Sequence, residues 1–311
     1  HHGKEVITMP PAIQCLDSSR YFPKVKANDH INLTIEPHQI FGLLGPNGCG
    51  KTTLLHQLQG LDAPTSGTVK VLGLDPRRDR QELMARIGTQ LQEARVIPRL
   101  KVIEVLTTFG SFYPQSQDPM TVLESVGLAA KAGAFVDKLS GGQRQRVFIA
   151  LALIHNPELL FFDELTSALD PQSRLKIWDI LRELKAAGRT VILTTHSMEE
   201  AQTLCDRIAI MDAGHIIAEG TPDELIDEFA QGSTLKFSVS GTVQPAPLEK
   251  ISGVTSVDIQ GQDVTIIGKG DFTPHVMQVL TDQHVSPAHM SLNPATLEDV
   301  FLHLTGRSLQ A

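Results

Sequence analysis

The fold is decided by the stretch Gly45-Pro46-Asn47-Gly48-Cys49-Gly50-Lys51-Thr52, which has the form G-x-x-x-x-G-K-[ST]. It follows the apolar run 40–44, which predicts a buried strand, and it precedes a stretch with helical character. Glycines allow backbone N–H groups to turn inward around phosphate oxygens, and the start of a helix adds partial positive charge. The stretch therefore predicts a strand, a phosphate-binding loop and a helix within an α/β fold.

Two side chains at the end of this loop have the chemistry that a nucleotide requires. Lys51 can reach the terminal phosphates, and the hydroxyl of Thr52 can bind Mg²⁺. By chance the pattern is expected in on the order of one chain in a hundred of this length, and the strand before and helix after it lower that figure. Nucleotide binding follows, but the loop alone does not distinguish a kinase, a GTPase and a transport ATPase.

A second polar position follows the apolar run Leu159-Leu160-Phe161-Phe162, which ends in Asp163 and Glu164. A buried strand would hold the Asp163 carboxylate at the edge of the sheet, where it can bind Mg²⁺ directly or through water. Glu164 would then be placed to accept a proton from an attacking water. A strand that ends in two solvated acids is the simpler alternative, and the phosphate-binding loop makes that alternative less favoured.

Composition excludes several classes of protein. The chain has 311 residues, of which 41% are hydrophobic and 20% charged, with a net charge of -8. These values indicate a globular protein and argue against binding nucleic acid or anionic lipid through bulk charge. The longest apolar run, 147–154, is far shorter than a membrane span of about 20 residues. Three scattered cysteines do not suggest a disulfide framework. We therefore expect a soluble, cytoplasmic protein.

The pattern of apolar and polar residues along the chain predicts two domains. Apolar runs alternate with helical patterns over residues 12–229, which is typical of a buried, mostly parallel sheet. After a Gln-Gly-Ser joint the pattern changes, and residues 234–307 predict a small α+β domain. There, two strand-like runs flank Gly261-Gln262-Asp263, which indicates a hairpin. We expect an open antiparallel sheet of ferredoxin-like plan in this second domain.

A second helix start with anion-binding character is Leu139-Ser140-Gly141-Gly142-Gln143, directly before a long helical stretch. Ser-Gly-Gly alone usually caps a helix. In this chain the segment resembles the LSGGQ signature of the nucleotide-binding subunits of ABC transporters, and it lies upstream of the acidic strand end as in that family. The resemblance spans about residues 12–228. Three more motifs occur in the family's order: a glutamine loop at Gln92, Ser167-Ala168-Leu169-Asp170, and a histidine at 196 after an apolar run.

The resemblance implies a role for each matching residue. It implies Glu164, His196 and Gln92 as catalytic residues, and Thr52, Gln92 and Asp163 as ligands of Mg²⁺. Residues implied to bind ATP are Tyr21, Gly45, Asn47, Gly48, Gly50, Lys51, Thr52, Thr53, Ser140, Gly142, Gln143 and Asp170. Tyr21 and Gln92 each have a neighbour that is an alternative for the same role. Phe22 is the alternative to Tyr21 as the aromatic residue that stacks on adenine, and Gln90 is the alternative to Gln92.

Three departures from the family pattern leave the catalytic groups in place. Cys49 stands where the family commonly has Ala or Ser, and its thiol introduces an oxidisable group near the nucleotide. Leu165 replaces a proline after Glu164, and Pro37-His38 replaces a basic residue and a glycine. The resemblance therefore still implies an active ATPase with a P-loop NTPase core, a helical subdomain and a small C-terminal α+β domain.

The end of the chain narrows the resemblance. Residues 295–307 resemble the tail of ATPases that serve type-2 ABC exporters, the branch that includes daunorubicin-resistance pumps. Leu297, Val300, Phe301 and Leu304 also have helical spacing, so the segment simultaneously predicts a helix that packs on its own domain.

The resemblance implies ATP-driven export of a drug, lipid or similar substrate through a separate membrane permease. It implies that two copies pair head to tail, that ATP and Mg²⁺ are cofactors, and that the protein lies on the cytoplasmic face of the membrane through its permease. A groove beside the Gln92 loop would receive the permease's cytoplasmic helix. Two alternatives are an importer ATPase with a regulatory C-terminal domain and a soluble ABC ATPase without a permease. The single phosphate loop, the lack of sustained heptads and the acidic balance disfavour the second alternative and a nucleic-acid partner.

Overall fold

The computed structural model describes residues 9–90 and 99–307. The chain divides into two compact units, the first ending at Thr221 and the second beginning at Pro222. The sequence places the domain boundary at 229 instead, because the motifs end upstream of that position. The difference concerns one helix, 222–229, and our assignment of domains 12–229 and 234–307 stays a proposal.

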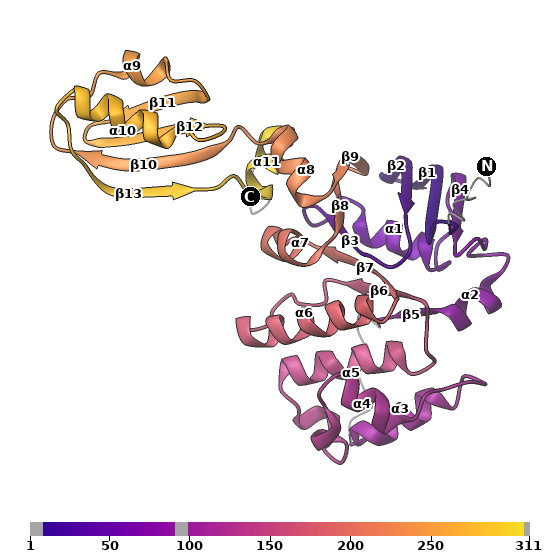
Figure 1. The fold of residues 1–311 in the computed structure, drawn as a ribbon. Helices are drawn as coiled ribbons and strands as arrows, with labels where there is room; N and C mark the ends of the chain where they lie inside the picture. The colour runs from indigo at the N-terminus through magenta and orange to yellow at the C-terminus, as the bar shows by residue number, and fades with distance from the viewer. Residues whose placement is uncertain (1–8, 91–98, 308–311) are drawn as a thin grey trace, which may run out of the picture. The chain divides into compact units, whose positions relative to one another are not determined.

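The first unit is built on a six-stranded sheet with the order β5-β6-β7-β3-β8-β9 (Figure 1). All neighbours are parallel except β9, which pairs with β8 in antiparallel fashion. The strands β3, β6 and β7 are buried along their whole length, which explains why most of their residues are apolar. The strands are β3 (Ile40–Leu44), β5 (Ile87–Thr89), β6 (Leu159–Asp163), β7 (Thr190–Thr195), β8 (Arg207–Asp212) and β9 (His215–Gly220).

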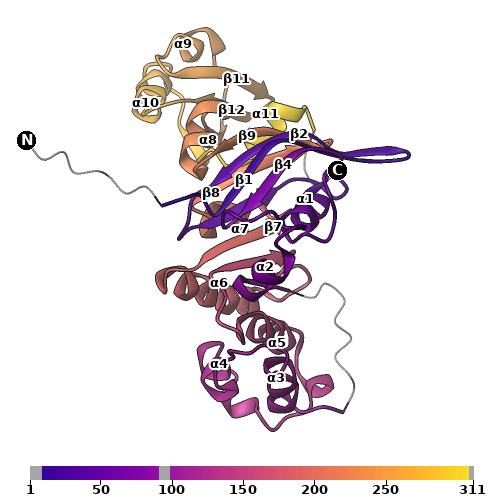
Figure 2. The same cartoon turned by 90° about the vertical axis from the view of Figure 1, so that its right-hand side faces the viewer.

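A second sheet of three antiparallel strands has the order β2-β1-β4 and lies beside helix α1 (Figure 2). Its strands are β1 (Ile13–Phe22), β2 (Val25–Ile35) and β4 (Ser66–Val71). Ile13, Cys15, Ile31, Leu33 and Val71 from this sheet join Phe41 and Leu54 in one hydrophobic core. The core therefore fixes the β1–β2 hairpin against the strand and helix that flank the phosphate-binding loop.

Some helices of the first unit pack on its sheets, and others pack on one another in a helical layer. Helix α5 contacts α3, α4 and α6 in this layer, which corresponds to the helical subdomain implied by the sequence (Figure 1). The helices of the first unit are α1 (Lys51–Leu58), α2 (Arg80–Arg86), α3 (Val102–Gly110), α4 (Pro119–Ser125), α5 (Gly141–Leu153), α6 (Pro171–Ala186) and α7 (Met198–Leu204), with 3-10 turns at Ala129–Lys131 and Val136–Lys138.

The second unit is the small α+β domain. Its four-stranded antiparallel sheet has the order β11-β12-β10-β13, and its chain order is β-α-β-β-α-β, so it has the ferredoxin-like plan. Helix α11 packs on α8 within this unit. The elements are α8 (Pro222–Phe229), β10 (Ser233–Val239), α9 (Pro245–Glu249), β11 (Val254–Gln260), β12 (Asp263–Gly268), α10 (Thr273–Asp282), β13 (Pro287–Asn293) and α11 (Leu297–Thr305).

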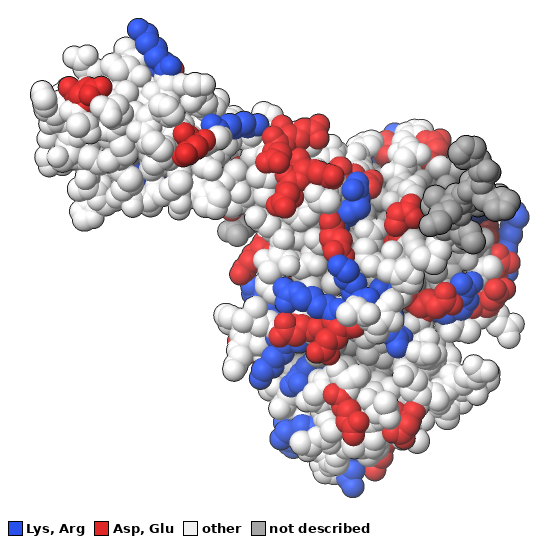
Figure 3. Space-filling view, in the orientation of Figure 1, with Lys and Arg blue, Asp and Glu red and all other residues white. Residues whose placement is uncertain are grey.

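The predicted fold class is confirmed: an α/β P-loop core with a helical layer and a small α+β domain. Within residues 9–90 and 99–307, none of the helices combines the length and the apolar character needed to span a bilayer. On the face seen in Figure 3, basic and acidic side chains of the first unit are interspersed.

Candidate nucleotide-binding site

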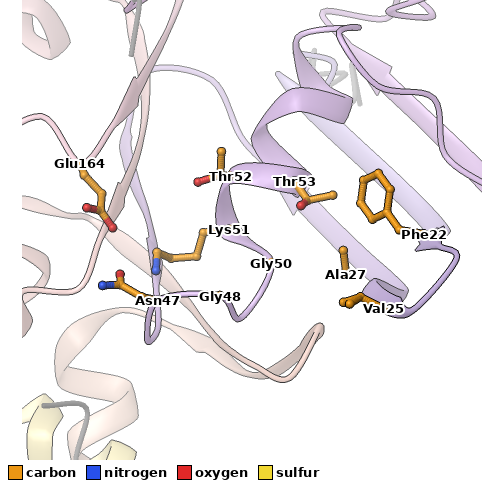
Figure 4. A pocket seen from close by; sticks show the side chains of 10 residues that line it. All are labelled: Phe22, Val25, Ala27, Asn47, Gly48, Gly50, Lys51, Thr52, Thr53 and Glu164. Atoms are coloured by element: carbon orange, nitrogen blue, oxygen red, sulfur yellow. The ribbon is translucent and has the colours of Figure 1, made fainter. Parts of the chain in front are cut away.

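A pocket of about 360 Å³ lies between the phosphate-binding loop, the β1–β2 hairpin and the end of β6. Figure 4 shows the side chains that line it, with Glu164 facing the loop from one side and Phe22 lying on the hairpin at the other. The lining residues are Phe22, Val25, Ala27, Asn47, Gly48, Gly50, Lys51, Thr52, Thr53 and Glu164. Seven of these ten are residues that the sequence analysis assigns to ATP binding or catalysis.

The path of the phosphate-binding loop depends on glycine at position 50. Gly50 has a φ of 107°, and a Cβ there would lie 2.1 Å from the carbonyl oxygen of Ala27. By contrast, a Cβ at Gly48 would meet no atom within 4 Å, although its φ of 80° is also left-handed. The last glycine of the motif is therefore required by close contact with β2, whereas Gly48 serves the turn itself.

Lys51 is almost fully buried and points back along the loop. Its ammonium donates hydrogen bonds to the carbonyl oxygens of Gly45 at 2.7 Å and Pro46 at 3.0 Å. An ammonium has three N–H donors, so one remains for a phosphate oxygen. A buried cation at the start of α1 adds to the partial positive charge of the helix, which makes this end of the pocket an anion-binding environment.

The hydroxyl of Thr52 and the carboxylate of Asp163 meet beside the loop. Thr52 donates to Asp163 Oδ2 at 3.0 Å, and Thr194 from β7 donates to Asp163 Oδ1. Asp163 is buried, and the two threonines hold its plane. Hydroxyl and carboxylate oxygens are the hard ligands that Mg²⁺ prefers, so this donor set fits the ion that the sequence analysis places here.

Glu164 is held at the pocket by its backbone. Its φ of 47° is left-handed, and its N–H donates to the hydroxyl of Thr194 at 3.0 Å. His196 lies at the end of the neighbouring strand, with Nδ1 3.4 Å from Glu164 Oε1. Both side chains remain partly exposed, so Glu164 can reach a water in the pocket, and His196 can reach the same region.

The predicted Gln92 lies outside the described residues, which end at Gln90 on this side of the gap. The Gln90 N–H donates to Phe161 O at 3.1 Å, so the backbone that leads toward Gln92 runs beside β6. The side-chain oxygen of Gln90 is buried and has no hydrogen-bond partner among the described residues. The roles given to Gln92 in catalysis and metal binding stay predictions.

The structure separates the two aromatic candidates, Tyr21 and Phe22. Phe22 lines the pocket and is 41% exposed, whereas the hydroxyl of Tyr21 donates to Asp29 outside the pocket lining. Adjacent residues of a strand point to opposite faces, so only one of the two rings can face the pocket. The geometry therefore favours Phe22, the competing candidate named in the sequence analysis, and a base-stacking role for either residue stays a proposal.

The second helix start is separate from the pocket lining of its own chain. The Ser140 hydroxyl accepts from the Gln143 N–H at 3.2 Å, and the Gln143 side chain accepts from the Ser140 N–H at 3.0 Å, which caps α5. Gly142 is required by contact with Ser173, since a Cβ there would lie 2.4 Å from the Ser173 hydroxyl. The Ser140 hydroxyl keeps its own O–H, which remains available to a phosphate.

Asp170 caps helix α6 and does not line the pocket. Its Oδ1 accepts from the Ser173 N–H at 2.9 Å, and the hydrogen bonds from Ser173 lower the pKa of Asp170. Asp170 is exposed and lies at the start of α6, next to the segment that carries the family motif. Ser140 and Asp170 are exposed and Gln143 is partly exposed, so a second chain can reach these three residues, whereas Gly142 is buried.

The cysteine in the loop is buried, and burial raises the pKa of the Cys49 thiol, while Lys51 acts in the opposite direction. The thiol is therefore the neutral form, which is the less reactive one. The sulfur lies close to Gly45, where a Cβ would be 2.7 Å from it.

Sequence reasoning missed a buried relay of amides behind the loop. Ser18 donates to Gln57 at 3.1 Å, Gln57 donates to Asn28 at 2.8 Å, and Asn28 donates to the carbonyl oxygen of Gly50 at 3.1 Å. The three side chains are at most 1% exposed. An Asn-Asp pair inside a strand is unfavourable for β structure, and that was the available signal. Thr194, which holds Asp163, was also missed.

These features define an ATP-binding cassette. The profile described as "ABC transporter" matches residues 28–167, and the profile described as "AAA domain, putative AbiEii toxin, Type IV TA system" matches residues 136–201. Among solved structures, cbiO1 from Clostridium perfringens, part of an ABC transporter complex, is 26% identical with a TM-score of 0.64, covering 70% of this chain and 92% of that one. The dimeric bacterial ABC transporter cassette MJ0796 is 29% identical with a TM-score of 0.59, covering 67% of this chain and 98% of that one.

Relatives that match nearly the whole chain are more specific. The Nod factor export ATP-binding protein I of Cupriavidus metallidurans is 39% identical over 289 residues, covering 91% of this chain and 93% of the relative. The protein of the same name from Rhizobium meliloti strain 1021 is 38% identical, covering 90% and 84%. The chain belongs to the ABC transporter family as an ATP-binding subunit of the exporter kind, and it is an ATP hydrolase. The importer and non-transport alternatives are not favoured.

Proposed function

We propose that this subunit hydrolyses ATP between two head-to-tail copies and thereby drives export through a separate membrane permease. The observation that supports this most strongly is the convergence of Lys51, Thr52, Asp163 and Glu164 around one pocket. A cation for the phosphates, oxygen ligands for a metal and a carboxylate for a water are the three elements of phosphoryl transfer to water.

Thr52 and Asp163 would hold Mg²⁺, and Gln92 is the third ligand we propose. When bound there, the ion neutralises charge that develops on the phosphate oxygens. The chain's own residues then divide the remaining work. Lys51 binds the terminal phosphates, and Glu164 accepts the proton of the attacking water as general base. His196, which lies beside Glu164, would contact the γ-phosphate.

A composite site is supported by four predicted ATP-binding residues that do not line the pocket at the phosphate-binding loop of their own chain. We propose that Ser140, Gly142, Gln143 and Asp170 of one copy close over the ATP bound to the loop of the other copy. The Ser140 hydroxyl and the start of α5 supply donors for the γ-phosphate. ATP then bridges the two chains, so ATP favours the closed dimer and hydrolysis releases it.

We also make proposals about the membrane subunit and the cargo. We propose that the permease places this subunit on the cytoplasmic face of the membrane, and that the groove beside the Gln92 loop receives a cytoplasmic helix of the permease. The cargo is a drug, a lipid or a similar substrate. Nod factor, named in the relatives, is the first cargo to test by export assays with a co-purified permease.

Glu164→Gln tests the catalytic assignment. The amide keeps the size of the side chain but cannot accept the proton, so we expect hydrolysis to fall by about 10²- to 10⁴-fold with ATP affinity retained. Steady-state phosphate release and calorimetry measure the two quantities. Glu183→Gln on the exposed side of α6 is the matched control and should hydrolyse ATP as the wild type does. Wild-type hydrolysis in Glu164→Gln would remove Glu164 from the mechanism.

A further inference from the structure

The tip of the β1–β2 hairpin presents different side chains to its two sides. We define residues 20–27 as the base-side hairpin. Phe22 pairs with Val25 across the strands, and both line the pocket together with Ala27 (Figure 4). Tyr21 pairs with Lys26 one position further from the tip, on the opposite face. The hairpin therefore has a pocket face and a back face.

On the back face, Asp29 holds the hairpin. It accepts a hydrogen bond from the Tyr21 hydroxyl and one from Lys26 Nζ at 3.4 Å, and the bond from Tyr21 is the main cause of a lowered pKa of Asp29. The Lys26 ammonium also lies 5.1 Å from the centre of the Tyr21 ring. His30 and His215 approach the same carboxylate with Nε2 at 3.7 and 3.8 Å.

Asp29 is itself fixed to the phosphate side of the pocket. Its N–H donates to the carbonyl oxygen of Gly214 at 2.9 Å, and the Gly214 N–H donates to the carbonyl oxygen of Cys49 at 3.0 Å. A chain of contacts therefore runs from the phosphate-binding loop through Gly214 and Asp29 to the hydroxyl of Tyr21. Deleting that hydroxyl would release the end of the hairpin nearest the pocket while leaving the other contacts in place.

The Phe22 ring is supported on the pocket face as well. The guanidinium of Arg20 lies 4.6 Å from the centre of the Phe22 ring, and Arg20 forms an ion pair with Asp62 at 3.3 Å. Arginine stacked on an aromatic ring restricts the ring's orientation. Phe22 is thus held both by a neighbour on its own face and by the strand beneath it.

We infer that Tyr21 is a positioning residue: its hydroxyl, bound to Asp29, orients the base-side hairpin so that Phe22 can stack on the base of the nucleotide. This inference rests on the proposed function, since it requires a base in the pocket. Tyr21 acts through Phe22 and touches no part of the nucleotide. Its contribution should therefore be confined to the base and absent for the phosphates.

The test compares two probes, MgATP and inorganic tripolyphosphate with Mg²⁺, on the full chain by calorimetry. Tyr21→Phe removes only the hydroxyl, and we expect the Kd for ATP to rise about two- to tenfold, the ratio that one ordinary hydrogen bond gives. The Kd for tripolyphosphate should not change. The chain has two tyrosines, so Tyr113→Phe, in the helical layer, is the matched control and should leave both values as in the wild type.

The Phe22→Ala variant separates a positioning role of Tyr21 from a general loss of order in the base-side hairpin. In a Phe22→Ala protein the ring is gone, so adding Tyr21→Phe should produce no further loss of ATP affinity. An equal loss in both backgrounds, an equal loss for tripolyphosphate, or no loss at all would overturn the inference. The proposed function fails separately, if the wild type binds neither probe or if Lys51→Ala binds both as the wild type does.

Discussion

The phosphate side and the base side of the pocket are built in different ways. On the phosphate side, loop residues 45–52 are fixed by backbone geometry, by the buried Lys51 and by the amide relay that ends on Gly50. On the base side, the hairpin is held by side chains at its surface, chiefly Tyr21 and Asp29. The loop residues of the phosphate side are thus recognisable from local sequence, whereas the base side depends on which face each residue of a strand presents.

The largest expected effect lies on the phosphate side. Lys51→Ala removes the buried ammonium that compensates the terminal phosphates, and we expect affinity for both ATP and tripolyphosphate to fall by about a hundredfold. Calorimetry with the two probes measures this. Lys131→Ala, an exposed lysine of the helical layer, serves as control. If ATP affinity were unchanged in Lys51→Ala, the assignment of the phosphate-binding loop would be wrong.

The two glycines of the loop offer a matched pair. Gly50→Ala places a Cβ 2.1 Å from the carbonyl oxygen of Ala27 on the hairpin strand, so the loop and β2 must separate. We expect a marked fall in thermal stability and a loss of binding of both probes. Gly48→Ala meets no neighbouring atom and should cost only the strain of its positive φ, about 1–2 kcal/mol. Equal Tm values for the two variants would contradict the role given to Gly50.

The smallest effect on the pocket is expected from removing the second unit, because both sides of the pocket lie in the first. A chain ending at Thr221 should bind ATP and tripolyphosphate within about twofold of the full chain, since every lining residue is retained. A chain ending at Phe229 keeps the amphipathic helix α8 but removes α11, the helix that packs on it. Light scattering should therefore show more self-association for the longer truncation. Loss of ATP binding in both would contradict the proposed domain division.

Much of this architecture could be predicted from the sequence. The runs 40–44, 159–162 and 191–193 lack charged residues because their strands are buried on both faces, and the polar residues after them meet at one edge of the sheet. Strand β13 was missed, although Ala288, Met290 and Leu292 alternate with polar residues there. Its side chains are largely exposed at the edge of the four-stranded sheet of the second unit, so the alternation does not mark a buried face.

The base side of the pocket shows what could not be predicted from the sequence. Tyr21 and Phe22 are adjacent aromatic residues, and nothing local distinguishes them. The choice is made by Asp29, which lies eight residues further along the chain and is brought to Tyr21 by the pairing of β1 with β2. The buried relay behind Gly50 has the same origin, because Ser18, Asn28 and Gln57 come from three different elements.

Closure of two copies over ATP is tested most directly by the mass of the Glu164→Gln protein in solution, measured by size exclusion with light scattering. Because the bridging γ-phosphate is not consumed, we expect twice the mass of a single chain with MgATP and the mass of a single chain with MgADP. Adding Ser140→Arg blocks the face offered to the opposite copy, so the ATP-bound protein should return to a single chain. The same mass with both nucleotides, or a dimer that persists after Ser140→Arg, would contradict the head-to-tail site.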